Sequence, residues 1–354
     1  MAYRADDVLA DTDRIVSPEL YEHYGKALRR SIDVTFTQDN GSGLSDRLRA
    51  NASWFAAHKS AYVMQALRGI EADDAIQDKA SAKKMALKLF DRWTDAEVNT
   101  ATARARTAKQ FEEFMQPDNA RLFPNLRWIA SRSADPRASH TKFYDRVWAK
   151  TDPFWQTNAP GTEWNCKCDI EETDDPVTDN SGVPHHIPPR GLEGNPAETG
   201  QLFTENASYV RGTRGVPEIE IIRTARDTFQ ARNKGAEIVT DTNLGRIVAD
   251  DISIVEASKG SATEQNLFMK QEIVLNISRY VDKLEFLRDE AIDLSHNNKK
   301  GLFFKKKRQF SVMKVYRLLL ESKNYQGELV QMDFIVKMGK FKSSGDFHLY
   351  SITG

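Results

Sequence analysis

The two cysteines of the chain, Cys166 and Cys168, are separated by one residue. A disulfide between such close cysteines is strained, so they rarely bridge each other. Both thiolates can instead point at one metal ion, and a tetrahedral Zn²⁺ then needs two further ligands. We expect His140 to be the third ligand, and a water molecule or one of three carboxylates to be the fourth: Asp135, Asp152 or Asp169. The alternative is that both cysteines are reduced and buried as small apolar side chains.

The last third of the chain holds a different set of reactive residue types. Cleavage of RNA through its own 2′-hydroxyl needs a base, an acid and a cation for the phosphate, and no metal. His296 and His348 could share the acid and base roles because histidine titrates near neutral pH, and Tyr350 could hydrogen-bond a phosphate oxygen. A basic run would bind the phosphates: Lys305, Lys306, Lys307 and Arg308. The alternative is that His348 faces solvent on a sheet, the run is a solvated loop, and the region is an interaction module.

Two further motifs are weaker candidates for a metal site and for a phosphate-binding loop. His185 and His186 are adjacent, and neighbours on an extended chain point to opposite sides, which makes one shared ion awkward. The sequence from Gly212 to Gly215 is not a phosphate loop, because it lacks the preceding strand, the following helix and the Lys-Ser/Thr pair.

The first half of the chain has a mostly helical pattern. Apolar residues recur at helical spacing over 51–67 and again over 81–108, where no Pro or Gly interrupts. In the second stretch these residues are Met85, Leu89, Trp93 and Val98. Residues 126–131 predict a short strand, and residues 135–169 are irregular and rich in aromatics. We expect the tryptophans to pack into the core.

The last part of the chain predicts a compact unit with a helix before an antiparallel sheet. Residues 247–255 indicate one or two short strands, and residues 264–288 an amphipathic helix. Alternation then predicts three strands, at 310–320, 330–338 and 347–352, with a hairpin turn at 324–327. The predicted fold class is therefore α+β and multidomain.

Length and composition limit the class of protein. The 354 residues suggest two or three domains. The 50 basic and 51 acidic side chains leave a net charge of -1, which argues against a uniformly basic coat for nucleic acid. No run of about 18 apolar residues predicts a membrane span, and the polar N-terminus lacks a secretory signal. Two cysteines exclude a disulfide-stapled scaffold.

The composition is uneven along the chain. All six tryptophans and both cysteines lie in the first 170 residues, whereas residues 176–217 hold six of the twelve prolines. We interpret this proline-rich stretch as an extended connector, or as an arm that orders only on a partner. The predicted segments are a helical region over 1–70, a second segment over 71–175, the connector over 176–217 and the α+β domain over 218–354.

The second segment resembles the head-morphogenesis, or minor capsid, proteins of tailed bacteriophages, the family of the phage Mu F protein. The resemblance rests on an Arg-rich stretch with a His at 132–140, Asp-Pro-Phe-Trp at 152–155, and Pro followed by Trp-Asn-Cys-Lys-Cys at 160–168. Lys167 stands where the family usually has Arg, which keeps the charge but loses the bidentate fork.

The resemblance implies a structural role in the phage head. Such a protein is made in the bacterial cytoplasm, is packed in few copies into the virion, and lies near the portal. Its partners would be portal and capsid proteins, and zinc binding by the His and Cys positions is implied as well. Three nearby arginines could contact capsid, portal or DNA phosphates, or could be solvated: Arg132, Arg137 and Arg146.

Residues 218–354 resemble the small phage-associated domains grouped with barnase, EndoU, colicin and RelE type nucleases. The shared features are a helix before the sheet, the strand at 310–320 and the closing strand at 347–352. This resemblance implies an alternative function, a toxin-like metal-independent ribonuclease carried on a phage head scaffold, with RNA or DNA as partner. A third alternative is a zinc-stabilised binding protein unrelated to capsids.

Overall fold

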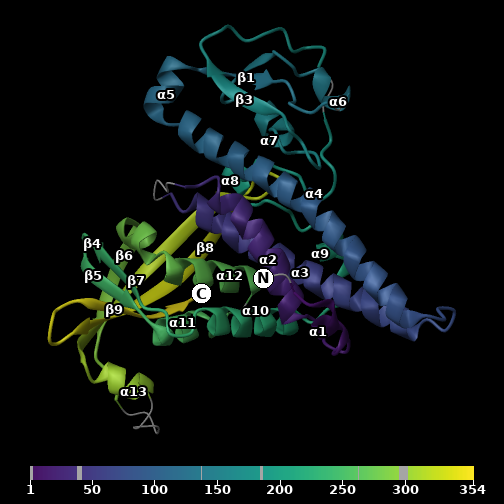
Figure 1. Ribbon diagram of the computed structural model, residues 1–354. Helices are drawn as coiled ribbons and strands as arrows, with labels where there is room; N and C mark the ends of the chain where they lie inside the picture. The colour runs from purple at the N-terminus through teal and green to yellow at the C-terminus, as the bar shows by residue number, and fades with distance from the viewer. Residues whose placement is uncertain (1–2, 38–41, 137, 184–185, 262, 295–301) are drawn as a thin grey trace. The chain divides into compact units, whose positions relative to one another are not determined.

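The computed structural model describes residues 3–37, 42–136, 138–183, 186–261, 263–294 and 302–354 (Figure 1). The chain forms two compact units. Unit 1 comprises residues 1–39, 51–216 and 322–329, and unit 2 comprises residues 40–50, 217–321 and 330–354. Long helices in the first part and a large sheet in the second confirm the predicted α+β class. Within the described residues, no helix has the length and apolar character that crossing a membrane requires.

The first part of the chain is built on helices. They are α1 (Ala5–Leu9), α2 (Pro18–Asp33), α3 (Leu44–Ala72), α4 (Lys79–Phe114) and α5 (Pro117–Leu122). The side chains of Ser17 and Asp78 accept backbone hydrogen bonds at the starts of α2 and α4, as N-caps do. The helical stretches predicted at 51–67 and 81–108 lie within α3 and α4, so both predictions are confirmed.

The buried face of α4 is not the face that its large apolar residues mark. Met85, Leu89 and Trp93 are 70%, 41% and 44% exposed. The residues that face the interior are a different set, in which two large apolar side chains are followed by small or polar ones: Leu87, Phe90, Thr94, Glu97, Ala101, Arg104 and Ala108. A polar face can be buried here because its polar groups find partners on neighbouring segments. The prediction that the tryptophans are core residues is therefore wrong for Trp93.

A small irregular structure follows α5, which we call the cap segment (residues 125–173). Its sheet has the order β2-β1-β3 and is antiparallel throughout. Its elements are β1 (Asn125–Ile129), α6 (Ala138–Thr141), β2 (Val147–Ala149), α7 (Phe154–Asn158) and β3 (Asp169–Thr173). Trp128 and Trp155 stack at 6.2 Å in its core, and Trp148 is buried beside them. Both cysteines belong to this core.

The predicted connector is largely packed rather than free. Within residues 186–216, the side chains of Leu202 and Phe203 are fully buried. Arg104 of α4 is also fully buried, and its guanidinium donates hydrogen bonds to several carbonyls of this stretch, including that of Leu192 at 2.9 Å. Burial lowers the pKa of Arg104 to about 10. The connector prediction is revised because these carbonyls, which lack a regular ladder, are satisfied by one buried cation.

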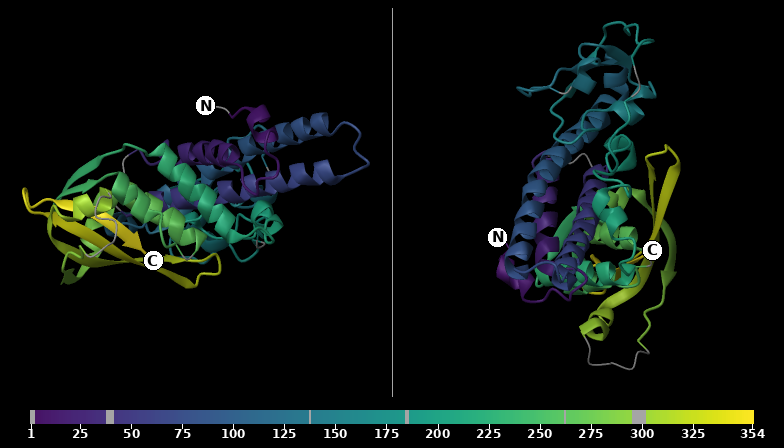
Figure 2. Two further views of the ribbon diagram at one scale, coloured as in Figure 1. Left: turned by 90° about the horizontal axis from the view of Figure 1, so that it is seen from below. Right: turned by 90° about the vertical axis from the view of Figure 1, so that its right-hand side faces the viewer.

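Unit 2 carries a six-stranded sheet with the order β4-β5-β9-β8-β7-β6. Its strands are β4 (Ile238–Thr242), β5 (Gly245–Ala249), β6 (Leu284–Glu290), β7 (Phe310–Lys323), β8 (Leu329–Phe341) and β9 (Phe347–Thr353). β5 and β9 are parallel, whereas β4–β5, β6–β7 and β8–β9 are antiparallel. The helices are α8 (Pro196–Thr199) and α9 (Ser208–Gly212) in unit 1, and α10 (Glu218–Arg232), α11 (Asp251–Ala257), α12 (Glu264–Leu275) and α13 (Leu302–Lys307) in unit 2. α11 and α12 contact β9, on the helical side of the sheet that Figure 2 shows.

The three predicted C-terminal strands are confirmed as β7, β8 and β9, but two other predictions need correction. The predicted helix at 264–288 ends at Leu275, passes through a 3₁₀ turn at Ile277–Lys283 and continues as β6. The predicted strands at 247–255 are one strand and one helix. Asp250 and Ser253 form a capping box that stops β5 and starts α11.

Candidate functional site

The cysteines lie in a loop that α4 holds in place. The backbone N–H of Asn165 donates a hydrogen bond to Thr100 Oγ1 at 3.0 Å, and Asn165 itself adopts a φ of 56°. Gly161 has a φ of +90°, and a Cβ there would lie 2.8 Å from Arg104 Cγ. Glycine is therefore required at the start of the loop. His140 reaches the same place from α6.

The structure brings the three predicted metal ligands together. His140 Nδ1 lies 3.7 Å from Cys166 Sγ and 3.5 Å from Cys168 Sγ. All three side chains are buried, and their donor atoms lie within 4.8 Å of one another. The ring of Trp128 packs edge-on against His140 with centroids 5.7 Å apart. Two sulfurs and an imidazole nitrogen at this spacing fit the donor set of a tetrahedral Zn²⁺.

The two thiols share their titration. A hydrogen bond from Cys168, together with the nearby His140, lowers the pKa of Cys166 below its usual range, although burial acts in the opposite direction. The same hydrogen bond, together with burial, raises the pKa of Cys168 well above its usual range. The pairing therefore favours the thiolate form of Cys166, and a thiolate is the form that ligates metals.

A second group lies on the other side of His140. His140, Glu163 and His186 also place donor atoms within 4.8 Å of one another. His186 Nε2 is 3.4 Å from Glu163 Oε1, and its ring is 5.3 Å from that of His140. Because His140 faces the sulfurs through Nδ1, its Nε2 remains for this group, and it has no hydrogen-bond partner among the described residues. A carboxylate beside the outer nitrogen of a ligating histidine typically orients its ring.

Of the carboxylates proposed as fourth ligand, Asp135 is the one that lines the same pocket as the cysteines and His140. This pocket has a volume of about 390 Å³. Asp152 instead accepts a hydrogen bond from the backbone N–H of Phe154. Asp169 accepts one from the side chain of Gln110. A water molecule or Asp135 therefore remains for the fourth position.

The three arginines of this region have different surroundings. Arg132 is exposed and lies 3.8 Å from a carboxylate oxygen of Asp169. Arg146 donates to the backbone carbonyl of Asp179 at 2.8 Å. Arg137 lies outside the described residues. Their predicted contacts with capsid, portal or DNA remain predictions.

The structure describes only one member of the acid–base pair predicted for unit 2. His296 lies outside the described residues. His348 is fully buried on β9, where its ring packs against Phe310 and Phe341, so it does not face solvent as the alternative supposed. Its Nε2 lies 3.0 Å from Asp250 Oδ1. In this arrangement no phosphate reaches the imidazole, and the nuclease role remains a prediction.

Two of the four basic residues at 305–308 contact other side chains of unit 2. Lys306 pairs with Asp250 at 3.0 Å, and Lys307 Nζ lies 5.3 Å from the centre of the Tyr350 ring. Burial raises the pKa of Tyr350 to about 12. Lys305 and Arg308 are exposed. Phosphate binding by this run is untested.

Sequence reasoning missed three residues that the structure places at these sites. Asp250 lies in a stretch that was predicted to be strand, and it joins His348 to Lys306. Glu163 lies within the motif at 160–168, but nothing in the sequence indicated that it contacts a histidine. His186 was considered only with His185, which lies outside the described residues, and not with the distant His140.

The comparisons with known proteins match the part of the chain that holds the cysteine cluster. Residues 60–171 match the family model described as Phage Mu protein F like protein. The "Mu-like prophage FluMu F protein" of Haemophilus influenzae is 31% identical over 84 residues, which cover 24% of this chain and 19% of that protein. The "Putative capsid assembly protein F" of Escherichia phage Mu is 33% identical over 73 residues, covering 21% and 16%.

These similarities cover a limited part of each protein. The matched stretch spans less than a fifth of the length of either relative. No solved structure matches the chain. The predicted resemblance to phage Mu F-like proteins is confirmed for residues 60–171, which include His140 and both cysteines. Unit 2 lies entirely outside residues 60–171, and its resemblance to nucleases remains a prediction.

Proposed function

We propose that this chain acts in assembling the head of a tailed phage or prophage, as a minor capsid component. One observation carries the proposal: the stretch similar to Mu F-like proteins covers α4 and nearly all of the cap segment, including its buried cysteine–histidine cluster. The printed name of the phage Mu relative refers to capsid assembly. The proposed partners are portal and capsid proteins, with the chain made in the host cytoplasm and retained near the portal of the virion.

We infer that the cap segment needs a cross-link between its short elements to stay folded in this role. Its strands have five, three and five residues, and its helices four and five. Elements this short bury little apolar surface by themselves, and small folds of this kind often rely on a metal. We propose that His140, Cys166 and Cys168 hold a structural Zn²⁺. When bound, the ion would cross-link α6 to the loop before β3 and fix the cap surface.

The proposal can be tested on particles. Heads would be purified on density gradients from a host carrying the phage that encodes this chain, and their peptides quantified against the major capsid protein. We expect peptides of this chain in a low and constant ratio to the major capsid protein. Their absence from both filled and empty heads would contradict a role as a capsid component.

A further inference from the structure

The first half of α4 exposes a row of large apolar side chains. Met85, Leu89 and Trp93 are four residues apart, so they lie along one face of the helix. Their exposed fractions, given above, are high for side chains of this size. Within the described part of unit 1 no segment covers them. A contiguous apolar strip on an otherwise polar helix is typical of an interaction surface.

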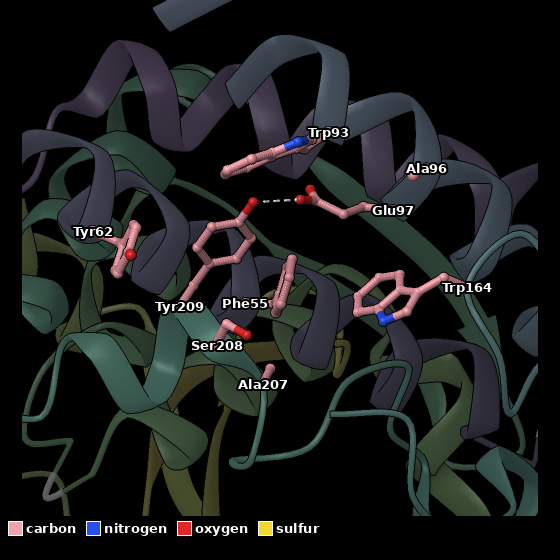
Figure 3. A pocket seen from close by; sticks show the side chains of 9 residues that line it. All are labelled: Phe55, Tyr62, Trp93, Ala96, Glu97, Trp164, Ala207, Ser208 and Tyr209. Carbon is pink, nitrogen blue, oxygen red and sulfur yellow. Dashed lines mark hydrogen bonds between the residues drawn. The ribbon is translucent and has the colours of Figure 1, made fainter. Parts of the chain in front are cut away.

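The row ends at a pocket. Trp93 forms one wall of a cavity of about 410 Å³, with Phe55 and Tyr62 from α3, Tyr209 from α9 and Trp164 from the cysteine loop. Figure 3 shows Phe55 between Tyr209 and Trp164, with Trp93 on the α4 side. The volume suits one bulky side chain of a partner, and aromatic walls favour an apolar or aromatic one.

The single carboxylate of the pocket is already neutralised. Glu97 Oε1 accepts a hydrogen bond from the Tyr209 hydroxyl at 2.9 Å, which Figure 3 draws, and Oε2 accepts one from Lys59 Nζ at 2.7 Å. Both carboxylate oxygens of Glu97 therefore already have a hydrogen-bond donor, and no further cation is needed to pair with them. The pocket is therefore better suited to an apolar side chain than to an ammonium or guanidinium group.

A basic row runs beside the apolar one. Lys84, Lys88 and Arg92 each precede a member of the apolar row, are exposed, and have no ion-pair partner among the described residues. The two rows together form a face that we call the α4 face: an apolar stripe with three basic side chains along one edge, which the exposed Asp95 follows one turn after Arg92. The complementary surface is an amphipathic helix with an apolar stripe flanked by acidic side chains.

We propose that the α4 face docks an acidic amphipathic helix of a partner protein, with one bulky apolar side chain of that helix entering the pocket. Two copies of this chain would bring like-charged rows together, which disfavours self-association. A nucleic acid would use the basic row, but the aliphatic side chains of Met85 and Leu89 offer no stacking platform. The inference does not depend on the role in head assembly.

The test uses the full-length chain and synthetic helical peptides. The acidic probe carries leucines and one tryptophan on one face with glutamates beside them, and the control probe has lysines in place of the glutamates. We expect the acidic probe to bind with a dissociation constant on the order of micromolar in fluorescence anisotropy, and the lysine probe at least about tenfold more weakly. Raising the salt concentration should weaken binding of the acidic probe.

Variants distinguish this face from other surfaces. Trp93→Ala and Met85→Ser should each weaken the acidic probe about tenfold, and Met85 is too exposed for its loss to unfold the chain. Lys88→Glu should weaken the acidic probe and strengthen the lysine probe. Met115→Ser, which changes another exposed methionine at the end of α4, should leave binding unchanged.

Several outcomes would overturn the proposal. Equal binding of the acidic and lysine probes would remove the charge argument. Binding of single-stranded oligo-dT or of anionic vesicles that is lost in Met85→Ser would assign the face to nucleic acid or lipid. A dimer in analytical ultracentrifugation that is lost in the same variant would assign it to self-association.

Discussion

The side chains that could do chemistry in unit 1 converge on His140. Its Nδ1 faces two sulfurs, and Glu163 and His186 lie on its other side. The sequence predicted the three residues as a group, because two cysteines one residue apart and a histidine in a preceding block are residue types that ligate metals. It did not predict His186, because no local pattern relates a residue in a proline-rich stretch to a histidine so far from it.

The metal proposal predicts a composition that can be measured. Protein purified without chelators should contain about one Zn²⁺ per chain by inductively coupled plasma mass spectrometry. Cys166→Ser should lose most of the metal, because one of three buried donors is gone. Fluorescence of the cap tryptophans should then report melting at lower temperature.

Lys167→Ala is the matched control for this experiment. Lys167 lies between the two cysteines but is exposed, so its removal should leave both the metal content and the melting temperature unchanged. The metal proposal fails if wild-type protein that was purified without any chelator contains no metal.

At the scale of elements, patterning predicted where helices and strands occur better than where they end. β7 and β8 were predictable because their alternation matches the pleat of a half-buried sheet, whereas β9 is buried along most of its length. The 264–288 stretch was misread because its apolar residues continue at helical spacing beyond the end of α12 at Leu275. The exposed apolar face of α4 was equally unpredictable, since periodicity identifies an apolar face but not whether the same chain covers it.

Asp250 joins three elements of unit 2, which leads to a stability prediction. It caps α11, lies 3.0 Å from His348 Nε2 of β9, and pairs with Lys306 of α13. Asp250→Asn should keep the cap but lose the charge, whereas Asp250→Ala should cost about 1 kcal/mol more. Urea unfolding of the two variants, followed by circular dichroism, measures the difference. Equal stability of both variants would remove Asp250 from the capping role.

The charge of Asp250 also predicts a pH dependence. Burial raises the pKa of this carboxyl, but the contacts with His348 and Lys306 outweigh burial and lower it below its usual range. A lowered folded-state pKa stabilises the fold above the unfolded value of about 3.9, and this contribution is lost as the pH falls below that value. The stability difference between wild type and Asp250→Asn should therefore be largest near neutral pH and shrink on acidification. A difference that stays constant down to the acid transition would contradict the charge argument.

The buried ion pair between α3 and α4 gives a second prediction at this scale. Lys59 Nζ donates to Glu97 Oε2 at 2.7 Å, and to Thr94 Oγ1 and the Phe90 carbonyl. Removing one partner of such a pair leaves an uncompensated buried charge, so Glu97→Ala should cost about 3–5 kcal/mol. The double variant with Lys59→Met should cost clearly less than the sum of the two single changes in urea unfolding. Additive costs would mean that the two groups are not coupled.

At the scale of the whole molecule, the proline-rich stretch is the clearest departure from what the sequence indicated. The described part of this stretch holds only two short helices, α8 and α9, which agrees with its proline content. The composition could not show that Arg104 binds the stretch or that Leu202 is buried. Such packing depends on long-range contacts between α4 and residues about 90 positions later. Composition therefore predicted a mostly irregular backbone for this stretch, but it did not predict that the side chains of the stretch are buried.

Limited digestion with trypsin tests this packing. Arg214 is exposed and precedes Gly215, which is also exposed and has open space where a Cβ would lie, so the bond after Arg214 should be cut early. Arg190 is also exposed, but the next residue, Gly191, packs against Ala207, so that bond should persist. Mass spectrometry of the first fragments identifies the order of cleavage. Early cleavage after Arg190 would show that the stretch is a free connector after all.

The most direct test of the account is whether heads form without this chain. The coding sequence would be deleted in the phage or prophage that carries it, and lysates would be examined by electron microscopy, with and without the full-length chain supplied from a plasmid. We predict that DNA-filled heads disappear on deletion and return with the wild-type chain, but not with a Cys166→Ser, Cys168→Ser variant. Normal numbers of filled heads in the deletion strain would contradict a role in head assembly.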